Sequence, residues 1–136
     1  MPLIENVPMF AVELGSHRIN AKNAYLISIT DPKDKKPEIA GKFAEVHYFK
    51  FHDLEKIPED MPDAILMNDA DATKIISILN KALAKNYDVV VHCGAGICRS
   101  GAVVEAATAL GFVPVHNNRI PNLHVKRKLF EKIIEV

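Results

Sequence analysis

The chain has 136 residues, which is enough for one domain with a single hydrophobic core and too few for two. Lys plus Arg and Asp plus Glu number 17 each, so no net field favours nucleic acid or an anionic membrane as a partner. No apolar run approaches the roughly 20 residues that cross a bilayer, and the first residues lack the basic start and apolar core of a secretion signal. The two cysteines lie in one loop and do not form an extracellular disulfide framework. We therefore expect a cytoplasmic protein.

Three short apolar runs in the first half of the chain predict strands. They cover residues 9–14, 25–29 and 45–51. The charged, proline-containing segment 31–37 after the second run is typical of a solvated turn. Residues 52–68 form a long acidic connection that contains prolines and shows no periodicity, so we expect irregular structure there.

A helix is predicted over residues 69–86, with Asn68 or Asp69 as its N-cap and acidic residues in its first turn. Its apolar residues repeat at helical spacing and define one buried stripe: Ile75, Ile76, Leu79, Ala82 and Leu83. The next run, residues 88–92, is apolar on both faces, which is typical of a central strand in a parallel sheet.

The last third of the chain predicts two more helices. One runs from Arg99 to Leu110 and ends at Gly111, and residues 112–115 follow as a short strand or extended loop. Pro121-Asn122 introduces the other, whose inward face is expected to hold Val125, Leu129, Phe130, Ile133 and Ile134. The order of elements predicts one α/β domain over residues 1–136, with a mostly parallel sheet of about four or five strands flanked by helices.

The most informative segment is the run His-Cys-Gly-Ala-Gly-Ile-Cys-Arg-Ser-Gly at residues 92–101, between the predicted central strand and a helix. Successive backbone N–H groups of such a loop can point at one anion, and the following helix directs the positive end of its dipole there. Arg99 offers a bidentate fork for a tetrahedral oxyanion, and the same field favours a thiolate at Cys93. The segment therefore predicts an oxyanion site with a nucleophile beneath it.

These residues resemble the signature of the cysteine-dependent protein phosphatases, which is His-Cys, five residues, Arg, then Ser or Thr. The chain is most similar to compact dual-specificity-type phosphatases of bacteria and phages. The signature covers about a tenth of the chain, and a weaker likeness extends to residues 51–53 and 121–122. The resemblance implies hydrolysis of phosphomonoesters without a metal or other cofactor.

The resemblance also implies roles for the residues of the motif. Cys93 is the expected nucleophile, Ser100 donates a hydrogen bond to its sulfur, and His92 supports the loop without moving protons. The phosphate oxygens are expected to bind the Arg99 side chain and the backbone of Gly94, Ala95, Gly96, Ile97, Cys98 and Arg99. Phosphate, sulfate and vanadate are expected ligands of the loop. Asn122 is expected to cap the last helix, and a role as a site residue is the second interpretation.

The general acid is expected in the connection before the motif. Asp53 ends the aromatic strand, as the Asp of the family's Phe-x-Asp pattern does, and is our first candidate. Asp63 follows Met-Pro in an arrangement similar to the Trp-Pro-Asp loop of larger tyrosine phosphatases. Asp60 is the third candidate, and a role for all three as solvated loop residues is the remaining interpretation.

Cys98 departs from most dual-specificity relatives. A cysteine at this place also occurs in the low-molecular-weight tyrosine phosphatases, which are similar only across this loop. One interpretation makes Cys98 a small packed residue. The other makes it a thiol that traps oxidised Cys93 as a disulfide, provided that the two Cα atoms lie within the roughly 4.4–6.8 Å that such a bond tolerates.

Other functions remain open at this point. The glycines at 94 and 96 lack the third glycine of a dinucleotide fingerprint, and no second ligand pair with zinc-site spacing is present. A rhodanese-type sulfurtransferase, an arsenate reductase that uses Cys98, and an inactive phosphate-binding module use the same thiol loop. No lysine lies inside the loop, so we expect a substrate with one phosphate: a phosphorylated protein or a small phosphomonoester, with phosphotyrosine first and phosphoserine or phosphothreonine second.

Overall fold

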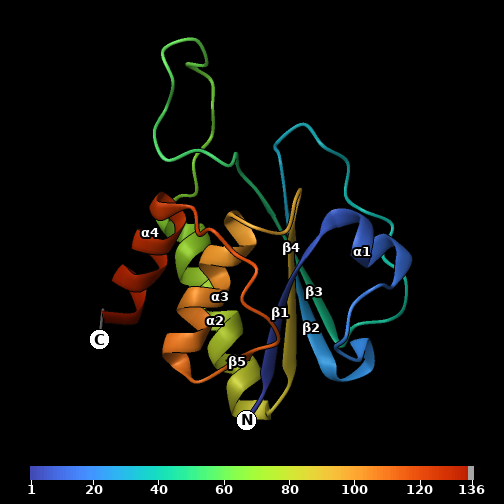
Figure 1. The fold of residues 1–136 in the computed structure, drawn as a ribbon. Coiled ribbons are helices and arrows are strands. Elements are labelled where there is room, and N and C mark those ends of the chain that lie inside the picture. The colour runs from blue at the N-terminus through green and yellow to red at the C-terminus, as the bar shows by residue number, and fades with distance from the viewer. Residues whose placement is uncertain (135–136) are drawn as a thin grey trace.

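The computed structural model describes residues 1–134 and contains one five-stranded sheet, in which every paired strand is parallel to its neighbour. The strand order is β3-β2-β4-β1-β5 (Figure 1). The strands are β1 (Leu3–Pro8), β2 (Ala24–Thr30), β3 (Glu45–Lys50), β4 (Asp88–Cys93) and β5 (Val113–Pro114). Together with the helices on its faces, this sheet confirms the predicted α/β class.

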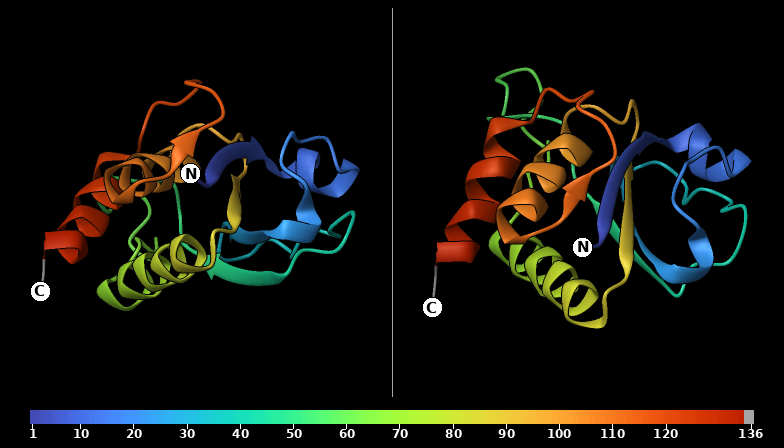
Figure 2. Two further views of the ribbon diagram at one scale, coloured as in Figure 1. Left: turned by 90° about the horizontal axis from the view of Figure 1, so that it is seen from below. Right: turned by 60° about the horizontal axis from the view of Figure 1, so that its bottom comes forward.

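Helices cover both faces of the sheet (Figures 1 and 2). They are α1 (Met9–Leu14), the short 3-10 helix η1 (Ala21–Asn23), α2 (Asp69–Lys85), α3 (Arg99–Leu110) and α4 (Leu123–Ile134). The larger core lies between the sheet and α2, α3 and α4, and a smaller one lies on the side of α1. No helix within residues 1–134 has the length and apolar character to cross a membrane.

Strand β4 lies at the centre of the sheet, between β1 and β2. Its residues Val89, Val90 and Val91 are fully buried, because helices and loops cover both faces of the sheet. This agrees with the prediction from a run that is apolar on both faces. The carboxyl ends of β1, β2, β3 and β4 therefore meet at one edge, where open α/β sheets bind ligands. The connection after β3 rises beyond that edge in Figure 1.

The prediction of a strand at residues 9–14 is wrong, because that segment is helix α1 and the first strand is β1. The polar residues Glu5 and Asn6 hid β1 in the sequence, since buried strands are usually apolar. Both are buried, and both are satisfied by distant loops: Glu5 Oε1 accepts hydrogen bonds from the backbone N–H groups of Arg18 and Ile19 at 2.9 and 3.1 Å.

The other predicted elements are confirmed to within a few residues, and Asn68 is the N-cap of α2, since its Oδ1 accepts a hydrogen bond from Asp71 N at 2.8 Å. On α4, Val125 and Leu129 are buried as expected. Ile134 is 75% exposed, so its predicted inward position is wrong. Ile133 packs against the core, and the next residue is turned by about 100° around the helix toward solvent.

Candidate functional site

The loop between β4 and α3 is packed against the end of β1. Asn6 Nδ2 donates a hydrogen bond to Gly96 O at 2.8 Å, and Met9 N donates one to Gly94 O at 3.2 Å. Gly96 has a φ of +76°, and a Cβ there would lie 2.3 Å from the backbone nitrogen of Pro8. Only glycine fits this position, because it needs both a left-handed backbone and a close approach.

The loop uses its carbonyl groups for hydrogen bonds and leaves its N–H groups free. Ile97 O accepts from Ile120 N at 3.2 Å, and Cys98 O accepts from Asn122 N at 2.9 Å. Within the described part of the chain, no protein group accepts a hydrogen bond from the backbone N–H groups of residues 94–100. These groups lie at and before the N-terminus of the 12-residue helix α3, and such an arrangement favours a bound anion.

Arg99 directs one edge of its guanidinium group toward this loop. The side chain is buried, and its Nη1 donates hydrogen bonds to Asp31 Oδ1 and to Phe51 O, each at 2.7 Å. Nε is buried without a hydrogen-bond partner, and a Cβ at Gly94 would lie 3.5 Å from Nη2. The Nε–Nη2 edge is thus available for bidentate contact with an oxyanion.

Cys93 is 2% exposed, and its Sγ lies 3.2 Å from Ser100 Oγ, in hydrogen-bond contact. The preceding His92 is fully buried, with Nε2 2.6 Å from Ser28 Oγ on β2 and Nδ1 3.3 Å from Cys93 O. Burial lowers the pKa of His92 to about 4, so the ring is neutral at physiological pH. A neutral imidazole with a hydrogen bond at each ring nitrogen suits the supporting role that the resemblance implies.

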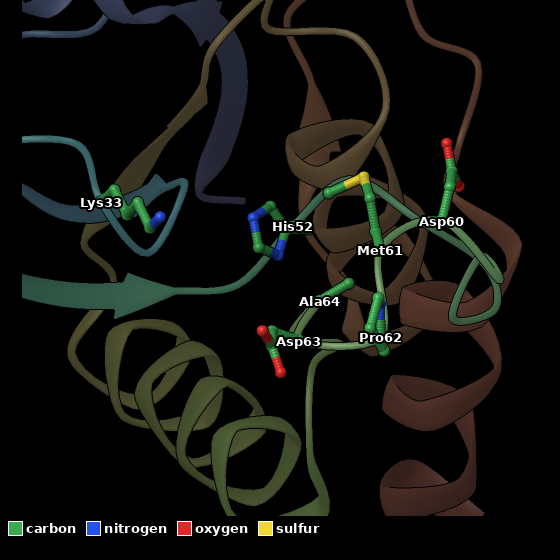
Figure 3. Close-up of a pocket in the computed structure, with 7 residues that line it drawn as sticks. All are labelled: Lys33, His52, Asp60, Met61, Pro62, Asp63 and Ala64. Carbon is green, nitrogen blue, oxygen red and sulfur yellow. The ribbon is translucent and has the colours of Figure 1, made fainter.

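Asp53 lies beside the carboxyl end of the loop. Its Oδ1 accepts a hydrogen bond from Asn122 Nδ2 at 2.8 Å, and Asn122 Oδ1 accepts one from Val125 N at 3.0 Å, so Asn122 caps α4 and holds Asp53. Burial and the Asp53 carboxylate raise the pKa of the Cys98 thiol. The other two acid candidates, Asp60 and Asp63, line a cavity further along the connection (Figure 3).

Two residues of this site were missed by sequence reasoning. Asp31 belongs to the segment predicted to be a solvated turn, yet it forms an ion pair with Arg99. Asn6 donates to Asn118 O at 3.0 Å as well as to Gly96 O, and so joins the loop to the segment before α4. The position of Asp31 directly after β2 could have indicated its place in the site, because β2 is next to β4 in the sheet. The order of the strands, however, cannot be read from the sequence.

We expect Asp31→Asn to bind inorganic phosphate roughly two- to fivefold more tightly than wild type. An amide oxygen can still accept from Arg99 Nη1, while the negative charge that partly neutralises the guanidinium is removed. Isothermal titration with phosphate measures the change. Asp34→Asn is the matched control, because Asp34 lies in the same turn and forms no ion pair within residues 1–134. Weaker binding by Asp31→Asn alone would show that its charge is required to orient Arg99.

Cys98 is partly exposed and Cys93 is buried, and both are free thiols. We expect peroxide to inactivate the wild type reversibly, and dithiothreitol to recover much less of the Cys98→Ala variant, because Cys98 traps oxidised Cys93. The raised pKa of Cys98 keeps it protonated near neutral pH, so trapping should become faster as the pH rises toward and above 9. Peptide mass mapping detects the Cys93–Cys98 link, and equal recovery without a link would leave Cys98 as a packed residue.

No protein-family model matches the chain, and no curated protein sequence matches it. Among residues 1–134, no three or more His, Cys, Asp or Glu side chains are grouped so that they could hold a metal ion. The interpretation of the site therefore depends on its own geometry and on the motif at residues 92–101.

Proposed function

We propose that this protein is a cysteine-dependent phosphomonoester hydrolase of the protein tyrosine or dual-specificity phosphatase type, active in the cytoplasm. The observation that carries the proposal is a set of hydrogen-bond donors without protein partners in one short segment. The backbone N–H groups of residues 94–100 and Arg99 Nε have no protein acceptor within residues 1–134, and this segment directly follows the Cys93 thiol. Positive groups that are already in place lower the energy of a transition state whose charge lies on phosphate oxygens.

The first step transfers the phosphoryl group to sulfur. The Cys93 thiolate attacks phosphorus, an S–P bond forms, and the bond from phosphorus to the ester oxygen breaks. Asp53 donates its proton to the departing oxygen. Arg99 and the loop N–H groups hold the three remaining oxygens throughout.

The second step releases phosphate. A water molecule attacks phosphorus, Asp53 takes one proton from it, and the S–P bond breaks to return the Cys93 thiolate. Ser100 Oγ lies 3.2 Å from that sulfur, where a hydrogen bond stabilises the leaving thiolate. Asp53 thus acts first as an acid and then as a base, and each cycle ends with the residues in their starting protonation states.

The charge at the site favours a substrate with a single phosphate. Arg99 is the cation that ends the loop, and Asp31 neutralises part of its charge. A polyphosphorylated substrate would require more positive charge than this. We therefore expect phosphotyrosine, and with it phosphoserine and phosphothreonine, to be hydrolysed.

The test is an assay of the wild-type protein with para-nitrophenyl phosphate and phosphotyrosine in the presence of a chelator. Parallel assays use thiosulfate with cyanide and arsenate with dithiothreitol, which report sulfurtransferase and arsenate reductase activity. We expect phosphate release, inhibited by vanadate. Thiocyanate or arsenite formation without phosphate release would assign the thiol to one of the other reactions, and binding of phosphate without any turnover would assign an inactive binding module.

A further inference from the structure

A cavity of about 390 Å³ lies between β1 and the segment that follows α1, and the proposed chemistry does not use it. Helix α1 packs on one side of the sheet, whereas α2, α3 and α4 pack on the other (Figure 1). The volume is within the range of small-molecule sites in proteins, roughly 300–1,000 Å³. The lining residues are Glu5, Gly15, Ser16, His17 and Arg18, none of which belongs to the loop at residues 92–101. The cavity is therefore a candidate ligand site of its own.

The carboxylate of Glu5 is buried in this region without a cation. Glu5 is 5% exposed, and no Lys, Arg or His of residues 1–134 forms an ion pair with it. Its hydrogen-bond donors are the backbone N–H groups of Arg18 and Ile19, which are neutral and bond the same oxygen, Oε1. A carboxylate that is removed from water is usually paired with a positive group, because it has lost its hydration. The charge of Glu5 is thus left without compensation.

The second carboxylate oxygen of Glu5, Oε2, has no hydrogen-bond donor within residues 1–134. It is not among the atoms that are buried without a partner, so solvent reaches it. Because nearly all of the residue is buried and Glu5 lines the cavity, the cavity is the route by which solvent arrives. A donor group of a ligand in the cavity can therefore reach Oε2.

A positive group that is not paired lies at the same cavity. The Arg18 side chain is exposed and forms no ion pair with a carboxylate of residues 1–134, although its backbone N lies 2.9 Å from Glu5 Oε1. The Ser16 side chain is exposed as well and adds a hydroxyl group that can donate or accept. A ligand with only a positive charge would be repelled by Arg18, and one with only a negative charge by Glu5. A molecule that carries both charges is attracted by both residues.

We propose that this cavity binds a small zwitterion of the α-amino acid type. Its ammonium group donates to Glu5 Oε2 and supplies the positive charge that the buried carboxylate lacks. Its carboxylate accepts from the Arg18 guanidinium group and from the Ser16 hydroxyl. The site is separate from the Cys93 loop, and binding there does not depend on the proposed phosphatase function.

The experiment is a titration of the full chain, labelled with ¹⁵N, followed by the amide signals in NMR spectra. The three probes are L-alanine, L-alaninamide, which has the ammonium group without the carboxylate, and propionate, which has the carboxylate without the ammonium group. We expect L-alanine to shift the signals of residues 15–18 in a saturable way. Its affinity should be at least about tenfold higher than that of either other probe, because each of these loses one charged hydrogen-bonding group.

Two variants assign the contacts. Glu5→Gln removes the charge and retains an amide oxygen that can accept from the backbone N–H groups of Arg18 and Ile19. Arg18→Gln removes the guanidinium group from an exposed side chain. Each should weaken the binding of L-alanine by about tenfold or more. Glu13→Gln and Arg127→Gln are the matched controls, because both residues lie outside the lining, and their affinity for L-alanine should equal that of the wild type.

Three results would overturn the site. The first is the absence of saturable shifts at residues 15–18 with L-alanine. The second is equal affinity for L-alanine and for either of the other two probes. The third is unchanged binding of L-alanine by Glu5→Gln or by Arg18→Gln. If circular dichroism shows that Glu5→Gln does not fold, Arg18→Gln and the comparison of probes on the wild type still decide. Phosphatase activity is no part of these measurements, so failure of the proposed function would leave them unchanged.

Discussion

Cys93→Ser should retain the fold and the binding of phosphate while losing turnover by roughly 10⁴-fold or more. The side chain is 2% exposed and contacts Ser100 Oγ, so an oxygen in place of sulfur leaves the packing nearly unchanged. A serine hydroxyl is not ionised near neutral pH and is a much weaker nucleophile there than a thiolate. The groups expected to bind the anion, Arg99 and the loop N–H groups, are not altered.

Three measurements check this expectation: hydrolysis of para-nitrophenyl phosphate, circular dichroism of the folded protein, and titration calorimetry with vanadate or phosphate. Cys98→Ser is the matched control, because it makes the same change at the other thiol and should retain turnover. More than a trace of phosphatase activity in Cys93→Ser would show that another group is the nucleophile. Loss of phosphate binding together with turnover would show instead that the sulfur is needed to hold the loop.

Asp53→Asn should lower kcat by roughly 10²- to 10⁴-fold on phenyl phosphate and phosphotyrosine, the range expected when a general acid is removed. The amide can still accept the hydrogen bond from Asn122 Nδ2, so the local structure is expected to remain. The loss should be smaller on para-nitrophenyl phosphate, whose leaving group needs little protonation. The basic limb of the pH–rate profile, where the acid has lost its proton, should disappear in the variant.

Asp31→Asn, Asp60→Asn and Asp63→Asn are the comparison variants, because each removes one other carboxylate near the site. None should reproduce the combination of a leaving-group-dependent loss and a missing basic limb. If Asp53→Asn behaves as wild type and one of the three shows that combination, the acid role belongs to that residue. Asp31 is the most informative comparison, because its carboxylate accepts a hydrogen bond from Arg99 Nη1 at 2.7 Å.

The segments that sequence reasoning predicted well are those whose determinants lie close together along the chain. Strand β4, its loop and helix α3 follow one another over residues 88–110, so apolar periodicity, the glycines and the Cys-x5-Arg spacing all describe one local unit. Helix α2 was equally readable, because its cap Asn68 and its apolar stripe are local features. The nucleophile, the arginine and Asp53 as acid candidate all come from such local signals.

The contacts that only the tertiary structure reveals depend on the order of the strands and on partners that are distant in sequence. Asp31 contacts Arg99 across 68 positions of sequence, and Asn6 contacts Gly96 across 90, because β2 and β1 flank β4. Strand β1 was missed for the same reason, since the loops that satisfy its buried polar residues are distant in sequence. Local pattern thus determined which groups carry the proposed chemistry, and the sheet order determined which side chains orient them.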